Sequence, residues 1–234
     1  MNYIKVLFKK HKKHLPKRLE GTVLGEILKY GFAIFASAWL FQGMLYMNWR
    51  ETLLKVFINI VTTYLLCIAG LPLGISLVLA HTLNFALNGQ LFAMYTHLGA
   101  TNVTSKLFLE QTILTSKRLY NSSSIEAAIA FGSLSRGNFK STSDIDIRFV
   151  PKKGEINFWL ACLFAVKERI LAFLNGYPLD LYVFDTKVLL KKMRSDELPI
   201  IVCEKNNSMQ SVYKNRLEMD EFVKMFNEKV ILRK

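Results

Sequence analysis

A long stretch without charged residues constrains this chain more than any other feature. No Asp, Glu, Lys or Arg lies between Lys55 and Lys106 of the 234 residues, and a second charge-free window spans residues 30–49. A hydrocarbon core of about 30 Å needs about 20 consecutive apolar residues to cross it, so such windows are typical of membrane helices. The chain beyond them has the mixed charges of a soluble domain. We therefore predict three regions: a basic arm at 1–29, a membrane region at 30–104 and a soluble domain at 105–234.

Two membrane spans are expected, at residues 30–49 and at about residues 56–80. Trp and Tyr gather toward the ends of the first window, as they do at membrane–water interfaces; a buried helix of a soluble protein is the alternative there. The second window contains Pro72 within the sequence GLPLG, and a proline removes a backbone donor from a helix. It therefore forms either one kinked span or two shorter segments. Residues 81–100 then lie along the interface or re-enter the membrane.

Polar side chains recur at helical spacing within this last segment. His81, Asn84, Asn88 and Tyr95 are spaced so that they fall on one face of a helix. Polar groups in an apolar setting usually face a neighbouring helix or a wet cavity. Three interpretations follow: hydrogen bonding between helices, including those of a homo-oligomer; a groove for a lipid-linked or polar substrate; or simple exposure at the interface.

Positive charge is concentrated at the N-terminus. Residues 1–29 hold eight Lys and Arg against two Glu. Each basic residue near anionic lipid contributes about 1 kcal/mol of attraction, and basic segments stay on the cytoplasmic side. Few aromatic residues interleave with the basic ones, which disfavours nucleic-acid binding. We expect a multi-pass protein of the plasma membrane with a cytoplasmic soluble domain, in which three cysteines without metal-ligand spacing stay reduced.

The soluble part predicts an α+β domain. Apolar residues recur at helical spacing over residues 105–121 and 155–175, and they alternate with polar ones in the sequence SDIDIRFV at 143–150, as in a strand. Further strands are expected at 125–131, 179–185 and 197–205, and further helices at 186–195 and 210–230. Strands interleaved with helices indicate a layered domain, here preceded by a helical transmembrane region.

Two aspartates one residue apart point to chemistry. Strand alternation sends Asp144 and Asp146 to the same face of the expected strand. Carboxylates this close repel each other unless a cation neutralises them. Mg²⁺ takes oxygen ligands and commonly binds through one or two carboxylates plus substrate phosphates. The pair therefore suits a divalent metal, Mg²⁺ or Mn²⁺, held between the protein and a nucleotide.

The loop before this strand offers groups for phosphate. Gly132 ends a strand where the backbone approaches something closely, and Ser133 offers a hydroxyl and an N–H. Turns with exposed N–H groups bind phosphate readily, and Arg136 and Lys140 add positive charge to the loop. Asp180, on a later expected strand, supplies a third carboxylate that completes a two-metal site and accepts a proton from an attacking hydroxyl.

Together these residues resemble the nucleotidyltransferase superfamily of DNA polymerase beta. Gly132-Ser133 is followed after ten residues by Asp144-Ile145-Asp146. The sequence GSLSRGNFKSTSDIDIRFV is similar to the minimal and the kanamycin-type aminoglycoside nucleotidyltransferases, which share a Gly-Ser, an Arg-Gly and a Ser-Asp-Ile-Asp. Arg136-Gly137 and Ser143 match these motifs, whereas Ser135 stands where those families often have Ala. The resemblance covers about residues 125–205.

The resemblance implies a polymerase-beta-like mixed sheet with flanking helices. It also implies transfer of a nucleoside monophosphate from an NTP such as ATP to an acceptor hydroxyl or phosphate, with release of pyrophosphate. Carried over to this chain, the roles are these: Asp144 and Asp146 bind both metals, Asp180 binds the catalytic metal and helps deprotonate the nucleophile, and Gly132 and Ser133 hold the β- and γ-phosphates. We add Arg136 as a neutraliser of the phosphates and Ser143 as a further nucleotide-binding residue.

The membrane region indicates what the acceptor is. Two spans and a polar-striped apolar segment favour an acceptor in the membrane: a lipid, a lipid-linked glycan or a protein. The alternative is a regulatory, antitoxin-like module that binds or nucleotidylates a partner protein. An inactive relative kept for binding, and a strand with merely solvated aspartates, also remain open. Extension of a nucleic acid is disfavoured, because the sequence shows no evident template-binding domain.

Overall fold

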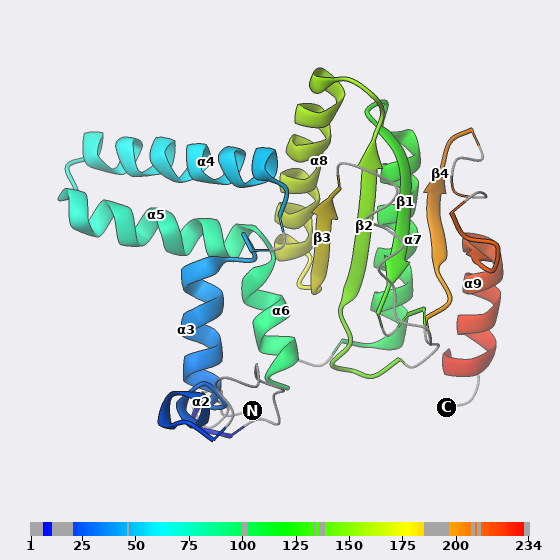
Figure 1. Cartoon of the computed structure of the whole chain (residues 1–234), viewed down its shortest axis with the longest axis horizontal. Coiled ribbons are helices and arrows are strands. Elements are labelled where there is room, and N and C mark those ends of the chain that lie inside the picture. Colours follow the sequence, from blue (N-terminus) through cyan, green and yellow to red (C-terminus); the bar gives the residue numbers. More distant parts are fainter. Residues whose placement is uncertain are drawn as a thin grey trace.

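A five-stranded mixed sheet forms the centre of the molecule (Figure 1). The computed structural model describes residues 7–10, 21–45, 47–99, 103–132, 134, 135, 139–184, 197–206, 209 and 212–231. The strand order is β3-β2-β1-β4-β5. The strands are β1 (Ile125–Phe131), β2 (Ile145–Pro151), β3 (Leu179–Val183), β4 (Ile200–Glu204) and β5 (Leu217–Glu218). β1 pairs antiparallel with β2 and β4, while β3 runs parallel to β2 and β5 parallel to β4.

Three helices cover one face of the sheet. They are α7 (Ser105–Asn121), α8 (Glu155–Leu174) and α9 (Met219–Phe226), which continues into a π-helical turn at Asn227–Ile231. Their apolar sides and the strand residues that face them form the main core. The strand residues in between, such as Ile129 and Phe131, form a smaller cluster on the opposite face. This alternation explains how β2 buries Ile145 and Ile147 against the helices while Asp146 points to the other face.

The elements expected in the soluble part are largely confirmed. α7 occupies the predicted residues 105–121, and Thr104 caps it by accepting a hydrogen bond from Leu107 N–H at 3.2 Å. The bounds of β1, β2, α8, β3 and β4 all lie within three residues of those expected. The C-terminal helix is shorter than expected and begins at Met219. The helix expected at 186–195 lies outside the described residues.

The N-terminal region is helical but divided differently from the expectation. A short α2 (Val23–Ile27) precedes α3 (Gly31–Phe41), α4 (Trp49–Ile68), α5 (Leu73–Leu87) and α6 (Gln90–His97). α4 and α5 pack side by side as a hairpin that protrudes from the rest of the protein, while α3 and α6 run in another direction from its base (Figure 1). We call α4 and α5 the apolar hairpin.

The prediction of one continuous span over residues 30–49 is wrong. Helix α3 ends at Phe41, because Gln42 and Gly43 both adopt left-handed backbone conformations, with φ of 47° and 74°. A right-handed helix does not accommodate such residues. A new helix then starts at Trp49, where the side chain of Asn48 accepts a hydrogen bond from Arg50 N–H at 2.9 Å.

A continuous span over residues 56–80 is also wrong, and the alternative of two segments is confirmed. α4 ends at Ile68, Gly70 adopts a φ of 93°, and Pro72 caps the start of α5. Residues 81–100 are not one segment either. α5 continues to Leu87, and Gly89, with a φ of 74°, separates it from α6. Glycine tolerates this conformation because it lacks a Cβ.

The polar residues expected on one helix face (His81, Asn84, Asn88 and Tyr95) contribute to contacts between helices. His81 Nε2 lies 2.8 Å from the carbonyl oxygen of Trp39 on α3, and the Asn84 amide donates to the carbonyl of Lys55 on α4 at 3.1 Å. The Asn88 amide donates to the Asn84 carbonyl at 2.6 Å. Tyr95 lies on the separate helix α6. Hydrogen bonding between helices is therefore confirmed for His81 and Asn84 within this chain, whereas the bond from Asn88 joins two residues at the C-terminal end of α5.

Among the described helices, only α4 is long and apolar enough to cross a membrane. α3 and α5 are shorter apolar helices. Only 17% of the most apolar window of α4 is buried inside the protein, whereas the core helix of a soluble protein would be mostly buried. Length and composition alone are weak evidence for a span, so the exposure of the helix is the more informative observation.

The base of the apolar hairpin is packed against the sheet domain. α4 and α5 contact α8, and α6 contacts β3. Arg50 on α4 forms an ion pair with Glu155 on α8, with a nitrogen–oxygen distance of 2.5 Å. The N-terminal helices thus share a packed interface with the soluble domain that the sequence predicted at residues 105–234. The two parts are not joined merely through a linker.

Candidate active site

The backbone of Gly132 passes against the carboxylate of Asp146. β1 ends at Phe131, which is the Cα partner of Asp146 across the β1–β2 ladder. Gly132 then takes a φ of 73°, and a Cβ at this position would collide with an oxygen of the Asp146 carboxylate. Both the backbone conformation and the contact require glycine here. The close approach expected at Gly132 is confirmed, and the group approached is this carboxylate.

Three aspartates come together at this end of the sheet. Asp146 and Asp180 are Cα partners in the parallel β2–β3 pair, so their side chains share a face. Asp144 lies just before β2, which begins at Ile145 rather than at residue 143. Burial, followed by the charges of Asp144 and Asp180, raises the pKa of the Asp146 carboxyl well above its usual range. The site therefore concentrates negative charge that a cation would relieve.

Ser143 shapes the turn that leads into β2. Its hydroxyl oxygen accepts a hydrogen bond from Lys140 N–H at 3.0 Å, and its own N–H donates to the Lys140 carbonyl at 2.9 Å. The side chain is buried. A contact between Ser143 and a nucleotide stays a prediction, whereas its role in placing Asp144 is visible in these bonds.

Residues 111–208 match the nucleotidyltransferase domain family. The matched region begins within α7 and runs past β4, so it contains Gly132, Asp144, Asp146 and Asp180. Its mixed sheet with flanking helices fits a nucleotidyltransferase fold. The apolar hairpin lies outside the match, and no curated protein matches the chain. The match supports the superfamily and transfer of a nucleoside monophosphate in general.

The donor set of this site suits a metal shared with a substrate. Within the described residues, no group of three or more His, Cys, Asp or Glu side chains is arranged to hold a metal ion by itself. Asp146 and Asp180 nevertheless offer carboxylates from neighbouring strands in register. Mg²⁺ is usually bound by one or two carboxylates together with phosphates and water. The residues therefore fit a divalent metal that arrives with a nucleotide, not a closed protein cage.

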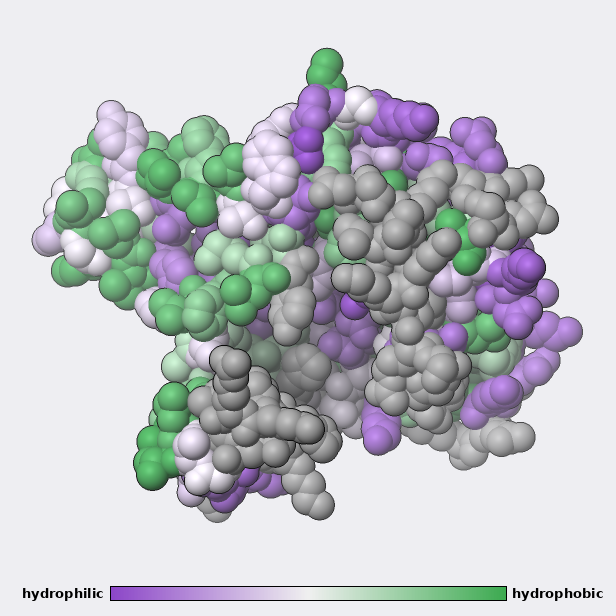
Figure 2. Space-filling view, in the orientation of Figure 1, coloured by the Kyte–Doolittle hydropathy of each residue, from purple (hydrophilic) through white to green (hydrophobic). Residues whose placement is uncertain are grey.

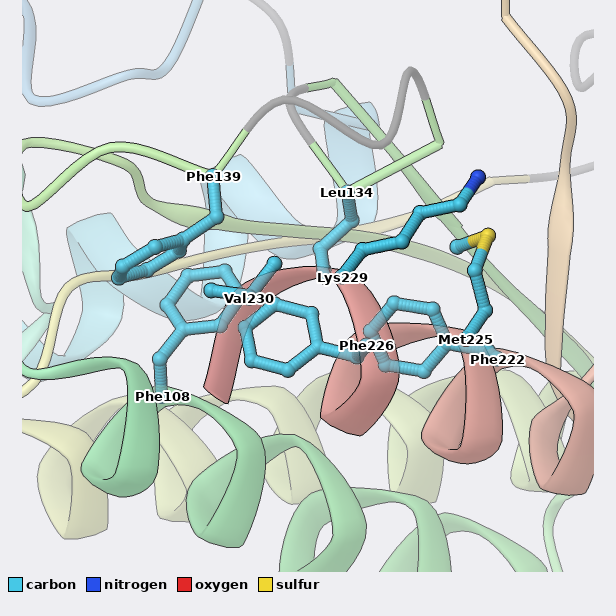
Figure 3. A pocket seen from close by; sticks show the side chains of 8 residues that line it. All are labelled: Phe108, Leu134, Phe139, Phe222, Met225, Phe226, Lys229 and Val230. Carbon is cyan, nitrogen blue, oxygen red and sulfur yellow. The ribbon is translucent and has the colours of Figure 1, made fainter. Parts of the chain in front are cut away.

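The ends of the glycine-containing loop are anchored in an apolar pocket. Leu134 and Phe139 point from the loop toward aromatic side chains of α7 and α9 (Figure 3). The Phe139 ring centroid lies 4.9 Å from that of Phe108 and 5.6 Å from that of Phe226. Ser133 and Arg136, both predicted to bind phosphate, lie outside the described residues of this loop.

Sequence reasoning missed Arg148 and Glu197. The Arg148 guanidinium carbon lies 4.8 Å from the Phe131 ring centroid and 5.4 Å from that of Phe184. Arg148 lies two residues after Asp146 on the same strand and therefore shares its face. This spacing is visible in the sequence and could have identified Arg148. The charge of Arg148 opposes the rise in the pKa of Asp146, whereas that of Glu197 adds to it.

Glu197 is near the site for a reason the sequence does not display. The next residue, Leu198, donates its N–H to the carbonyl of Ser135 in the loop at 3.1 Å. This bond brings the start of β4 beside the glycine-containing loop, although more than 60 residues separate them in sequence. Sequence position alone gives no indication of this contact.

Proposed function

We propose that this chain is a Mg²⁺-dependent nucleotidyltransferase of the cytoplasmic face of the plasma membrane. It transfers a nucleoside monophosphate from an NTP to a membrane-associated acceptor, which is a lipid, a lipid-linked glycan or a protein. One observation carries the proposal: the base of the apolar hairpin is packed along the side of the domain formed by β3 and α8, and β3 holds Asp180. An acceptor anchored in the bilayer beside the hairpin would approach the site from that side.

The residues of the site have complementary roles in the proposed reaction. An acceptor oxygen attacks the α-phosphorus, the bond from this phosphorus to the leaving pyrophosphate oxygen breaks, and the acceptor proton passes to the carboxylate of Asp180. Asp144 and Asp146 would hold both divalent metals and Asp180 the catalytic one, and Gly132 lets the loop backbone approach the phosphates. When bound, the metal neutralises the charge that develops on the phosphate oxygens.

The surface of the apolar hairpin suits insertion into lipid. Hydrophobic residues gather on its exposed surface (Figure 2). The exposed large hydrophobic residues of α4 and α5 are Trp49, Leu53, Val56, Phe57, Ile60, Val61, Tyr64, Leu65, Ile68, Leu73, Ile75, Leu77, Val78, Leu79 and Leu83. A soluble monomer rarely exposes an apolar surface this continuous. No charged side chain lies between Lys55 and the end of the hairpin, so no charge interrupts this surface.

The dimensions of the hairpin favour insertion from one side. The helical part of α4 beyond Lys55 runs to Ile68, which is about 20 Å at 1.5 Å per residue. The hydrocarbon core is about 30 Å thick. We therefore propose that the hairpin enters the bilayer and returns to the same side, in place of two full crossings. α3, which exposes Phe32, Leu40 and Phe41, would then lie along the membrane surface beside the basic arm.

Labelled nucleotides test the proposal. Membranes containing the full-length chain are incubated with Mg²⁺ and each of the four NTPs carrying ³²P at the α-phosphate, and the label is followed into lipid-extractable and protein fractions. We expect label in the lipid-extractable fraction, and its loss in Asp144→Ala and on chelation of the metal. Transfer that is unchanged in Asp144→Ala would overturn the proposal. Label confined to a co-purifying soluble protein would favour the antitoxin-like alternative instead.

A further inference from the structure

We propose that Glu51, at the base of the apolar hairpin, is a positioning residue that holds β3 in place and so sets the location of Asp180. Glu51 acts together with Arg169 of α8. The inference rests on the proposed nucleotidyltransferase function, and it makes the hairpin part of the catalytic architecture rather than an anchor alone.

β3 is an edge strand, and the backbone groups on its outer side need partners. Toward β2, the carbonyl of Pro178 accepts from Ile145 N–H at 3.0 Å, and Phe184 N–H donates to the Phe149 carbonyl at 2.9 Å. Because neighbouring residues of a strand direct their N–H and C=O groups to opposite sides, Leu181 and Val183 direct theirs away from β2. Among the described strands, none lies beyond β3. An uncovered edge of this kind is prone to fray or to pair with another chain.

Glu51 and Arg169 take the place of a neighbouring strand. Val183 N–H donates to Glu51 Oε2 at 3.3 Å, and Arg169 Nη2 donates to the Leu181 carbonyl. Arg169 Nη2 also donates to Glu51 Oε1, which joins the two side chains as an ion pair. Two backbone groups on the outer side of β3 are thereby satisfied by side chains from α4 and α8.

Both side chains are removed from water. Glu51 is 1% exposed and Arg169 2% exposed. Buried ion pairs often contribute less to stability than apolar residues of the same size would. In this pair, each member also forms a hydrogen bond with a backbone group of β3. We therefore infer that the pair fixes the position of the strand. An apolar replacement would fill the space without holding Leu181 and Val183.

A second contact joins the same helices to the same strand. The Arg169 guanidinium carbon lies 5.7 Å from the ring centroid of Tyr182, the residue between the two held backbone groups. The Tyr182 hydroxyl lies 3.2 Å from the position that a Cβ would occupy at Gly43, in the connection between α3 and α4. Asp180 and Tyr182 lie two residues apart on β3, so their side chains share one face of the sheet. Movement at the hairpin base therefore reaches Asp180 through residues in contact.

Two variants separate geometry from stability. E51L/R169M removes both charges and both backbone hydrogen bonds at similar volume, whereas R169K, with Glu51 kept, retains the acceptor for Val183 N–H and a donor of nearly the same length for the Leu181 carbonyl. E155Q removes the other ion pair between α4 and α8, which involves the half-exposed Arg50–Glu155 contact and does not touch β3. All three are prepared as full-length chains in membranes of the expression host, together with Asp144→Ala.

The readouts are the rate of label transfer per bound nucleotide, the KM for the NTP, and hydrogen exchange of the β3 amides. Misplacing a reacting group by about 1 Å can cost about a hundredfold in rate. We expect E51L/R169M to lose about tenfold to a hundredfold in rate with an unchanged KM for the NTP, and to exchange the Val183 amide faster. R169K should stay within about threefold of the unmodified chain, and E155Q should equal it.

Each result has a defined meaning. A folded E51L/R169M with unchanged rate and exchange overturns the inference, as does an R169K that is as impaired as the apolar pair. If the apolar pair does not fold, Glu51→Asp replaces it, because the shorter side chain keeps the charge and loses reach to Val183; an unchanged rate there also overturns the inference. Transfer that survives Asp144→Ala counts against the proposed function itself, whatever the Glu51 variants do.

Discussion

The Asp146 carboxylate lies so close to the Gly132 backbone that no side chain fits between them. Gly132 also adopts a φ of 73°. The loop that follows β1 and the aspartate of β2 are therefore placed relative to each other by direct contact, before any ligand binds. This contact makes glycine a requirement of the site and not only of the turn.

Gly132→Ala should abolish most activity. A residue with a Cβ pays about 1–2 kcal/mol for the left-handed conformation, and the new methyl group would displace Asp146 as well. Gly176→Ala is the matched control, because Gly176 has a φ of 66° and open space where a Cβ would be. We expect both variants to lose a similar amount of stability in denaturant titrations, and only Gly132→Ala to lose transfer by about a hundredfold. Equal activity losses would show that backbone strain alone matters.

Asp146→Asn should stabilise the metal-free protein at neutral pH. The pKa of this carboxyl is raised in the folded state by burial and by its acidic neighbours, so folding favours the protonated form. The associated stability is present at pH values below the pKa of the unfolded chain, about 4, and is lost as the pH rises through the folded pKa. We therefore expect the stability difference between Asp146→Asn and the unmodified protein to grow from pH 4 toward pH 7.

Denaturant titrations at several pH values, in chelator, measure this difference. Each tenfold change in proton affinity corresponds to about 1.4 kcal/mol. Added Mg²⁺ with an NTP should stabilise the unmodified protein and have little effect on Asp146→Asn. A variant that is less stable than the unmodified protein at pH 7 would contradict the electrostatic account of this site.

Phe139→Ala should weaken nucleotide binding through the loop. The Phe139 ring packs between Phe108 of α7 and Phe226 of α9 and thereby holds one end of the glycine-containing loop. We expect the KM for the NTP to rise about tenfold, because a less ordered loop adds an entropic cost to binding. Phe164→Ala is the control, since this ring packs against Phe149 on the α8 side of β2. A KM that rises equally in both variants would point to general destabilisation.

Charges placed on the apolar hairpin should release the protein from lipid. Phe57, Ile60 and Leu65 are exposed on α4, at 62%, 61% and 58%. An aspartate at the centre of a bilayer costs about 2.5–3.5 kcal/mol, so changing all three to Asp should abolish co-flotation with anionic phospholipid vesicles. The control changes Ile156 and Leu174 of α8 to Asp, which are also exposed but lie outside the hairpin. Flotation of the triple variant would argue against insertion.

The features predicted well from sequence depend on neighbours along the chain. The period-two pattern of β2 placed Asp146 opposite the core, and the helical spacing of 105–121 predicted α7, because backbone geometry alone determines which residues share a face. A glycine followed by a short polar loop likewise indicated a close backbone approach. The group approached, however, could not be inferred before the β1–β2 register was known.

The features missed depend on contacts between distant segments. Arg50, Glu51 and Lys55 looked like charges flanking a membrane span, yet Glu51 and Lys55 are buried at the base of the hairpin. The Lys55 amine donates to the Gln42 carbonyl at 2.6 Å. Their partners lie on elements that only folding brings together, so no local pattern reveals them.

By itself, the sequence predicted the candidate site: a glycine, a pair of aspartates and a third aspartate within a nucleotidyltransferase-like region. Local sterics and strand alternation act over a few residues, so they relate the paired aspartates to each other. The sequence also determined that a long segment is too apolar for ordinary solvent exposure. Only the tertiary structure showed that Asp180 pairs in register with Asp146. It also showed that Glu51 and Arg169 form hydrogen bonds with the backbone of β3. The physical reason is that β-pairing and buried ion pairs join residues more than 30 or 100 positions apart, at distances that sequence spacing does not encode.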